Sequence, residues 1–391
     1  MKILATLFIF LLLAGCASAP PVPPAPSRLF SDATFTPPSE PIGADDLFAM
    51  SPEMQAYLDS APFRAQLHAK GLESGLVDAL YKQSALKLEY DAATTRTAAQ
   101  TFEARRGNCM SLVIMTAAFA KALGLSVRYQ NVVVDDTWRR AGGLHLASTH
   151  VNLSLSKSSR QSARGAAGDE RALTVDFLPS EDVAGYRSYR LEETAIIAMY
   201  MNNRAVESLL RNQVDDAYWW ARASLAQNPA FIAAYNTLAV IYQRHGDKPM
   251  AERSFRAALE REPENVMVMQ NLAPLLAALG NNEEAQALTR RIARIEPYPP
   301  FHFFDLGIAA MKRSDFQQAK TLFAREVQRA PYYDEFHFWL GVAYLQLGEA
   351  ARARTQIALA LDTSTTRDGR ALYAAQLDHL RSQSPMRSAG F

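Results

Sequence analysis

The sequence predicts an α+β domain followed by an all-α array of helical repeats. Two observations predict this organisation. In the first half, a helix that begins at Cys109 is followed by segments in which apolar and polar residues alternate, as they do in antiparallel strands. In the second half, prolines recur at a fixed interval between stretches of helical pattern. A chain of 391 residues is long enough for two folded units.

Composition and charge are those of an ordinary globular protein. Hydrophobic residues make up 49% of the chain and charged residues 21%, which excludes disorder on a large scale. Lys and Arg number 41 against 40 Asp and Glu, so the chain has no general attraction for polyanions. We therefore expect no nucleic-acid partner.

Residues 1–15 have the pattern of a secretory signal, because one lysine precedes an apolar run over residues 3–13. These eleven residues cannot span about 30 Å of hydrocarbon as a helix. The run ends in Leu-Ala-Gly-Cys at residues 13–16, which resembles the bacterial lipobox. The resemblance implies cleavage before Cys16, a lipid on its sulfur, and attachment to the periplasmic side of the outer membrane, since Ala17 replaces the usual retention aspartate. The alternative is an uncleaved anchor, or a plain signal peptide with a chance cysteine.

Residues 16–44 are dense in proline, which is typical of an extended, semi-stiff tether. We expect this stretch to hold the folded part away from the membrane. The first folded unit then covers residues 45–190. Its early part shows helical patterns over residues 45–58 and 61–81.

A second group of elements surrounds Cys109. Residues 97–106 are helix-like, and Gly107-Asn108 interrupts the pattern before a helix runs from Cys109 to about residue 123. We expect this helix to be buried almost all round, because apolar residues occupy most of its circumference. They are Met110, Leu112, Val113, Ile114, Ala117, Phe119, Ala120 and Leu123.

Strands follow that helix. Residues 126–134 are rich in Val and Tyr, and residues 172–177 form a short strand after a polar loop over residues 157–170. The segment 149–155 alternates most regularly, with polar residues on one face and apolar residues on the other. The polar face carries His150, Asn152 and Ser154, and the apolar face carries Val151, Leu153 and Leu155.

The second unit is marked by four prolines, each 34 residues from the next, at positions 229, 263, 297 and 331. A period of 34 is the length of the tetratricopeptide (TPR) repeat. One full repeat has the expected small and large residues at Tyr235, Leu238, Ala239, Tyr242, Gly246, Ala251, Phe255, Ala258 and Pro263. We count four repeats over residues 232–362, a degenerate one from about residue 198, and an amphipathic capping segment at 369–380, so the repeat region covers residues 198–383. Such repeats form a groove that binds a protein partner and have no chemistry of their own.

Cys109 is the candidate nucleophile. At the start of a helix, the backbone N–H groups and the helix dipole stabilise a thiolate. The same N–H groups could hold the oxyanion of a tetrahedral intermediate. If Cys16 is lipidated, Cys109 has no disulfide partner within the chain. The alternative is an inert core cysteine, and local sequence alone does not separate the two.

A cysteine nucleophile needs a base, and His150 on the polar face of its strand is a better candidate than His145 in the preceding loop. Asp176 lies between Val175 and Phe177, where a carboxylate without a partner would be costly, so it is the candidate that orients the histidine. Zinc bound by both histidines and an aspartate at 135 or 136 is a weaker alternative, because no thiolate pair accompanies them.

These residues resemble the transglutaminase-like superfamily. The similarity lies in Arg-Gly-Asn-Cys-Met-Ser at residues 106–111, in the helix and strand that follow, in the strand that begins at His150, and in Val175-Asp176. It covers residues 97–179 and implies a papain-like fold core with Cys109 as nucleophile, His150 as general base and acid, and Asp176 as its orienting partner. Two positions depart from the family, Asn152 where an aromatic is frequent and Phe177 where a proline is common.

The leading functional hypothesis is acyl transfer from a peptide or protein substrate through a Cys109 thioester. Water would make the reaction a peptidase or amidase reaction, and an amine would make it transamidation. The chemistry requires no cofactor and no metal. The alternative is a non-catalytic assembly lipoprotein, in which the TPR repeats bind a partner and the first domain is a binding module.

Overall fold

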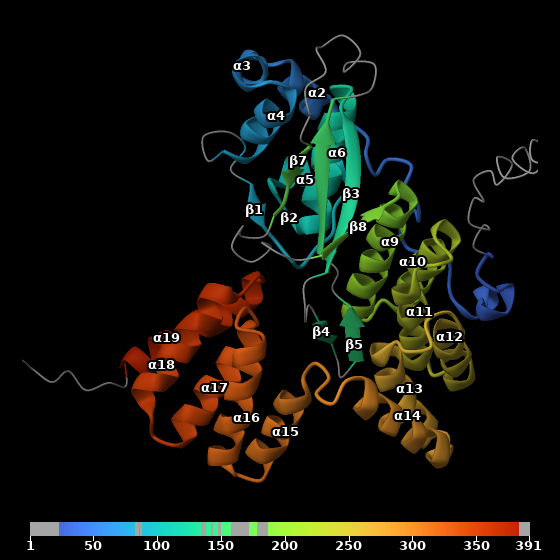
Figure 1. Ribbon diagram of the computed structural model, residues 1–391, viewed down its shortest axis with the longest axis vertical. Helices are drawn as coiled ribbons and strands as arrows, with labels where there is room; N and C mark the ends of the chain where they lie inside the picture. The colour runs from blue at the N-terminus through green and yellow to red at the C-terminus, as the bar shows by residue number, and fades with distance from the viewer. Residues whose placement is uncertain are drawn as a thin grey trace, which may run out of the picture.

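The computed structural model describes residues 23–82, 86, 88–133, 138–141, 144–147, 150–157, 172–177 and 187–382. An N-terminal mixed α/β region with a small antiparallel sheet is followed by all-α helical repeats (Figure 1). The expected signal peptide and Cys16 lie outside the described residues.

The early helices are α2 (Pro52–Asp59), α3 (Ala61–Lys70) and α4 (Leu72–Tyr81). The helix expected over residues 45–58 begins later, because Ser51 caps α2 and Pro52 occupies its first turn. The single helix expected over residues 61–81 is two helices. Gly71 adopts φ 82° between them, and this left-handed conformation ends α3.

Helix α5 (Ala98–Ala104) leads to α6 (Cys109–Ala122), which is the central helix of this region. Eleven of the fourteen residues of α6 are buried, which confirms the expected burial on all sides. The helix packs against α4 and α5 and against the sheet strands β3 (Ser126–Val133) and β6 (His150–Ser156). The start of α6 is therefore held from several sides.

The main sheet is four-stranded and antiparallel, in the order β7-β6-β3-β8. Strands β7 (Leu173–Val175) and β8 (Arg187–Leu191) lie at its edges. Strands β3, β6 and β7 agree with the expected ones within two residues, whereas β8 was not expected. Leu153 of β6 pairs with Val175 of β7, so residue 152 lies level with residue 176.

Two small ladders complete the region. Strands β1 (Glu89–Tyr90) and β2 (Arg106–Gly107) pair in parallel just before α6. Strands β4 (Trp138–Ala141) and β5 (Leu144–Ala147) form an antiparallel hairpin that lies against helices α11 and α13 of the repeats. The expectation that His145 lies in a loop is wrong, because His145 pairs with Arg140 within this hairpin.

Residues 27–42 differ from the extended tether that their prolines predict. They contain two 3-10 turns, η1 (Ser27–Leu29) and η2 (Asp32–Thr34), and they pack on the first repeats. Leu29 is buried, and the Phe35 ring stacks on Tyr218 with the centroids 3.9 Å apart. We call residues 27–42 the strap. The prolines favour an extended chain, and such a chain can still lie along a surface that offers apolar contacts.

The described residues 187–382 include five helical hairpins and a last helix, as the proline period predicts. Gly307 lets neighbouring helices approach, since a Cβ there would lie 2.5 Å from the Phe323 ring. The hairpins are α9 (Glu193–Leu210) with α10 (Val214–Gln227), α11 (Ile232–His245) with α12 (Lys248–Arg261), α13 (Val266–Ala278) with α14 (Asn282–Ile295), α15 (His302–Lys312) with α16 (Phe316–Arg329), and α17 (Asp334–Gln346) with α18 (Ala350–Thr363). Helix α19 (Arg367–Ser382) packs on α18 as the expected cap.

One hydrophobic core joins the two parts of the molecule. It runs from Leu29 of the strap through α6 and the sheet into the hairpins up to α14. The later hairpins have two smaller cores of their own. The N-terminal α/β region and the first repeats are thus packed around a shared core. A substitution in that core is expected to affect the packing of both parts.

Candidate active site

The segment before Cys109 sets the start of helix α6. Asn108 caps the helix, because its Oδ1 accepts the Ser111 N–H at 2.9 Å and the Ser111 hydroxyl at 2.8 Å. Gly107 is required by the close approach of the chain: a Cβ there would lie 2.6 Å from the Ser111 Cβ. The sequence Gly-Asn-Cys therefore places Cys109 in the first turn of a long, buried helix.

Sheet pairing brings His150 and Asp176 together. His150 is the first residue of β6, and Asp176 directly follows β7. The Nε2 atom of His150 lies 2.6 Å from Oδ1 of Asp176. Asn152 donates its amide Nδ2 to the second carboxylate oxygen, Oδ2, at 2.7 Å. The two neighbours hold the carboxylate in one orientation and satisfy both of its oxygens.

Helix α6 packs on β6 and brings the thiol of Cys109 within hydrogen-bonding reach of His150. Burial lowers the pKa of His150, but hydrogen bonds with Asp176 and Cys109, together with their negative charges, outweigh it and raise this pKa to about 9. The arrangement favours a protonated His150 beside Cys109 at neutral pH.

The three side chains differ in exposure. His150 is 5% exposed, and the Asp176 side chain is 14% exposed, so their contact is shielded from water. Cys109 is only half-buried. A shielded histidine–carboxylate pair behind a more accessible thiol is what a nucleophile and its base require.

The sequence prediction named all three of these residues, and the structure brings them together. The sequence prediction assigned no role to Asn152 and treated it only as a departure from a family pattern. The alternation of β6 placed Asn152 on the same face as His150, and this was the available signal. Phe177, the other departure, packs against Tyr81 with ring centroids 5.3 Å apart.

The remaining candidates lie wholly or partly outside the described residues. His145 lies in β5, and its side chain is not among the described atoms. The aspartates at 135 and 136 and Cys16 lie outside the described residues.

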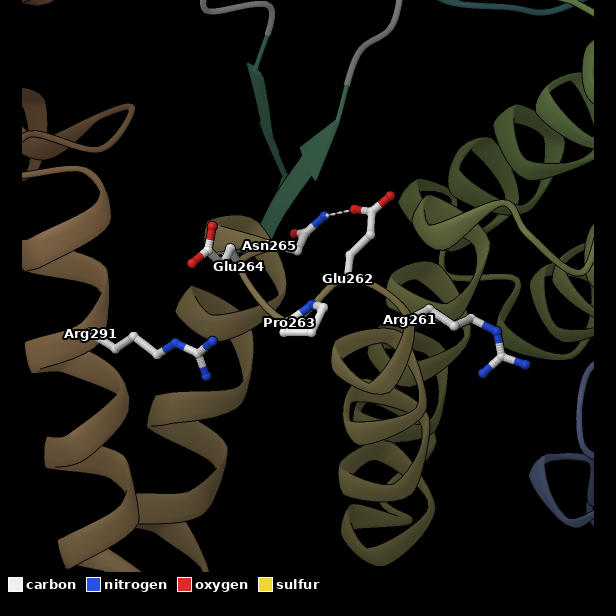
Figure 2. Close-up of a pocket in the computed structure, with 6 residues that line it drawn as sticks. All are labelled: Arg261, Glu262, Pro263, Glu264, Asn265 and Arg291. Atoms are coloured by element: carbon white, nitrogen blue, oxygen red, sulfur yellow. Dashed lines mark hydrogen bonds between the residues drawn. The ribbon is translucent and has the colours of Figure 1, made fainter.

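A hollow of about 660 Å³ lies elsewhere, at the loop between α12 and α13 (Figure 2). Three of its polar residues have structural partners: Asn265 caps α13 and donates to Glu262 at 2.8 Å, and the Arg261 guanidinium lies over the Tyr235 ring at 4.6 Å. It is an open cleft between hairpins, far along the chain from Cys109, and we assign no chemistry to it.

Comparison with known proteins identifies the repeats. Residues 236–300 and 304–368 match the tetratricopeptide repeat family, so the C-terminal half contains TPR repeats. The match does not extend to the N-terminal α/β region. No curated protein matches the chain. Repeats of this family typically bind protein or peptide partners, which indicates a role in protein–protein interaction.

Solved structures of repeat proteins are similar to part of the chain. A TPR protein of Thermus thermophilus is 20% identical over 46% of this chain and 98% of its own, with a TM-score of 0.33. The Pseudomonas aeruginosa protein pilF is 20% identical over 49% of this chain and 96% of its own, with a TM-score of 0.31. A chain of the APC/C hetero-tetramer Cut9–Hcn1 is 19% identical over 48% of this chain and 37% of its own, with a TM-score of 0.33.

Among the described residues, every helix is too short or too polar to cross a membrane.

Proposed function

We propose that the chain is a transglutaminase-like cysteine acyl-transfer enzyme whose TPR repeats recruit a protein or peptide partner. The observation that carries the proposal is the row Cys109–His150–Asp176, with His150 in contact with both neighbours. Asp176 orients the imidazole, His150 moves the proton, and the sulfur of Cys109 is the nucleophile.

The reaction begins with attack of the Cys109 thiolate on an amide carbonyl carbon. Backbone N–H groups at the start of α6, other than the Ser111 N–H that Asn108 accepts, would stabilise the oxyanion. The C–N bond then breaks, and the amine leaves with the proton of the His150 imidazolium. The products of this half are a Cys109 thioester, a free amine and a neutral imidazole.

Water or a second amine attacks the thioester carbon in the other half. His150 accepts the proton of the attacking group, the C–S bond breaks, and the thiolate–imidazolium pair is restored. Water gives a carboxylic acid, and an amine gives a new amide. The proposal includes the papain-like core over residues 45–190, the repeat region over 198–383, and attachment to the outer membrane through Cys16 after removal of residues 1–15.

Selective alkylation of Cys109 tests the proposal. Iodoacetamide at about pH 6 should modify Cys109 in the folded protein about tenfold faster or more than in urea-unfolded protein, because a free thiol is almost fully protonated there. Mass spectrometry of the Cys109 peptide keeps the signal separate from Cys16. Replacing His150 by Ala should remove most of the difference, whereas His145→Ala should leave it.

A second candidate is a scaffold lipoprotein without catalysis. It is favoured by the match to the TPR family, which accounts for a role in interaction without any chemistry. A Cys109 that iodoacetamide reaches only after unfolding would support the scaffold and contradict the enzyme.

A further inference from the structure

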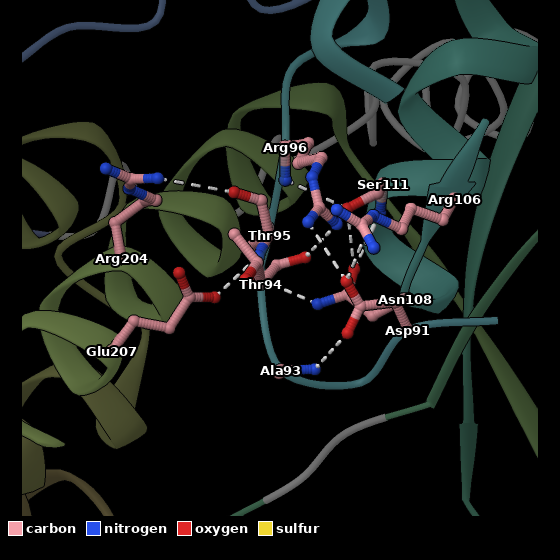
Figure 3. A network of polar contacts seen from close by, with 10 residues as sticks. All are labelled: Asp91, Ala93, Thr94, Thr95, Arg96, Arg106, Asn108, Ser111, Arg204 and Glu207. Atoms are coloured by element: carbon pink, nitrogen blue, oxygen red, sulfur yellow. Dashed lines mark hydrogen bonds and ion pairs between the residues drawn. The ribbon is translucent and has the colours of Figure 1, made fainter. Parts of the chain in front are cut away.

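A polar network connects the start of helix α6 with the first repeat hairpin (Figure 3). The connecting piece is the segment of residues 91–97, which runs between β1 and α5. Arg96 donates its backbone N–H to the Ser111 hydroxyl at 2.9 Å, and its guanidinium pairs with Asp91 at 2.9 Å. This segment is thus fixed to the first turn of α6 on one side.

Thr95 makes the second attachment to the same turn. Its hydroxyl accepts the side-chain N–H of Asn108 at 2.8 Å, and Thr95 is fully buried. Asn108 uses its other atom, Oδ1, to cap α6. The orientation of the Asn108 side chain therefore depends on Thr95. Cys109 directly follows Asn108 in the chain.

The repeats hold Thr95 in place. Glu207 of α9 is 8% exposed, and its Oε1 accepts the backbone N–H of Thr95 at 2.6 Å. Arg204, one turn earlier on α9, points at the carbonyl of Thr95 at 3.5 Å and pairs with Glu40 at 2.7 Å. Figure 3 shows Glu207 and Arg204 approaching Thr95 from the repeat side, opposite Asn108 and Ser111.

We infer that Glu207 is a positioning residue for the nucleophile, so that the first TPR hairpin completes the active site through the relay Glu207–Thr95–Asn108–Cys109. The inference rests on the proposed function of Cys109. A buried carboxylate that accepts a backbone N–H fixes that peptide firmly, because an unmade bond would leave a buried donor without a partner. Thr95 then presents its hydroxyl to Asn108 at a fixed place, and Asn108 in turn holds the first turn of α6, which carries Cys109.

The experiment measures the pH dependence of Cys109 alkylation by iodoacetamide in the full chain. Glu207→Leu removes the acceptor, and Thr95→Val removes the hydroxyl but keeps the N–H. We expect each to slow alkylation at about pH 6 about fivefold, the effect of losing a helix cap, and to move the midpoint of the profile to higher pH. Because both act on one relay, the double variant should be no slower than the slower single variant.

Two variants separate positioning from a general loss of stability. Glu207→Gln keeps an acceptor oxygen of the same reach and should restore the wild-type profile. Glu326→Leu is the matched control: Glu326 is also buried, at 2% exposed, and accepts the N–H groups of Phe303 and Phe304, but it lies in α16, away from the relay. It should lower stability and leave the profile unchanged.

The positioning role of Glu207 and the proposed function of Cys109 fail on different results. A reactive wild-type Cys109 with an unchanged profile in Glu207→Leu and Thr95→Val overturns the positioning role and leaves the proposed function standing. The positioning role is also overturned if Glu326→Leu changes the alkylation profile as much as Glu207→Leu does. A wild-type Cys109 no more reactive than the unfolded thiol overturns the proposed function, and this inference with it. If Glu207→Leu does not fold, the alkylation profile of Thr95→Val alone tests the positioning role.

Discussion

His150 is the residue whose protonation state decides what the site can do. It is buried, yet the hydrogen bonds and charges of Asp176 and Cys109 hold its pKa near 9 rather than below its usual value. Breaking either contact would remove part of what offsets burial and would lower the pKa of His150. Asn152 contributes indirectly, because it keeps the second oxygen of Asp176 occupied and so keeps the first oxygen on His150.

This raised pKa predicts a pH dependence of stability. The folded state holds the proton more tightly than the unfolded state, whose histidine has a pKa of about 6.5. The stabilisation is therefore complete below about pH 6.5 and is lost as the pH rises through about 9. In urea titrations, the stability difference between wild type and His150→Gln should shrink over this interval. A difference that stays constant or grows would contradict the charged His150.

The element that matters most is the first turn of α6, where the chain has almost no spare room. The three residues before Cys109 each have a structural task. Arg106 pairs with β1, Gly107 allows the approach of Ser111, and Asn108 caps the helix. The sequence predicts this turn correctly because its signals are local, a glycine and a cap residue ahead of an apolar helix.

Gly107→Ala tests that turn. The added Cβ would lie 2.6 Å from the Ser111 Cβ and 3.2 Å from a Thr101 methyl, so the start of α6 must shift. We expect a loss of about 1 to 3 kcal/mol in unfolding free energy, as for other overpacked positions, and slower alkylation of Cys109. Gly43→Ala is the control, because nothing lies within 4 Å of its Cβ position. Equal stability of the two variants in urea titrations would show that the turn has room to spare.

The elements that the sequence did not predict depend on distant partners. Among the described strands, β8 pairs with β3 alone, more than fifty residues earlier in the chain, and the hairpin β4–β5 lies against the repeats. Neither has a strong local pattern, and both are set by surfaces that exist only after the chain has folded. The repeats are the opposite case. Each hairpin has its own sequence signature, and the period of 34 residues predicts that neighbouring hairpins stack on one another.

At the scale of the whole molecule, the strap, the α/β region and the first repeats share one core. The strap makes polar contacts as well: Ser39 bonds to Asp216, and the Tyr242 hydroxyl donates to the carbonyl of Leu29 at 2.8 Å. Prolines predicted only that residues 16–44 would be extended. Their contacts with helices almost two hundred residues away could not be inferred from that composition.

Phe35→Ala tests whether the strap stabilises this shared core. Phe35 is 6% exposed and packs on Tyr218 and Tyr242. Removing the ring should lower the unfolding free energy by about 3 kcal/mol, as other buried Phe→Ala changes do. Leu372→Ala on helix α19 is the control, since Leu372 is 50% exposed. A urea midpoint for Phe35→Ala equal to that of the control would mean that the strap lies on the repeats without supporting them.

In the proposed reaction, Cys109 forms an acyl intermediate with the help of His150 and Asp176. The most direct measurement is a burst experiment with p-nitrophenyl acetate, in which nitrophenolate release is followed while mass spectrometry locates the acetyl group. We expect a burst of about one equivalent per chain with the acetyl group on Cys109. The burst should be absent in Cys109→Ser and strongly slowed in His150→Ala and Asp176→Asn. A wild-type protein with no burst, or a burst that persists in Cys109→Ser, would contradict the proposed reaction.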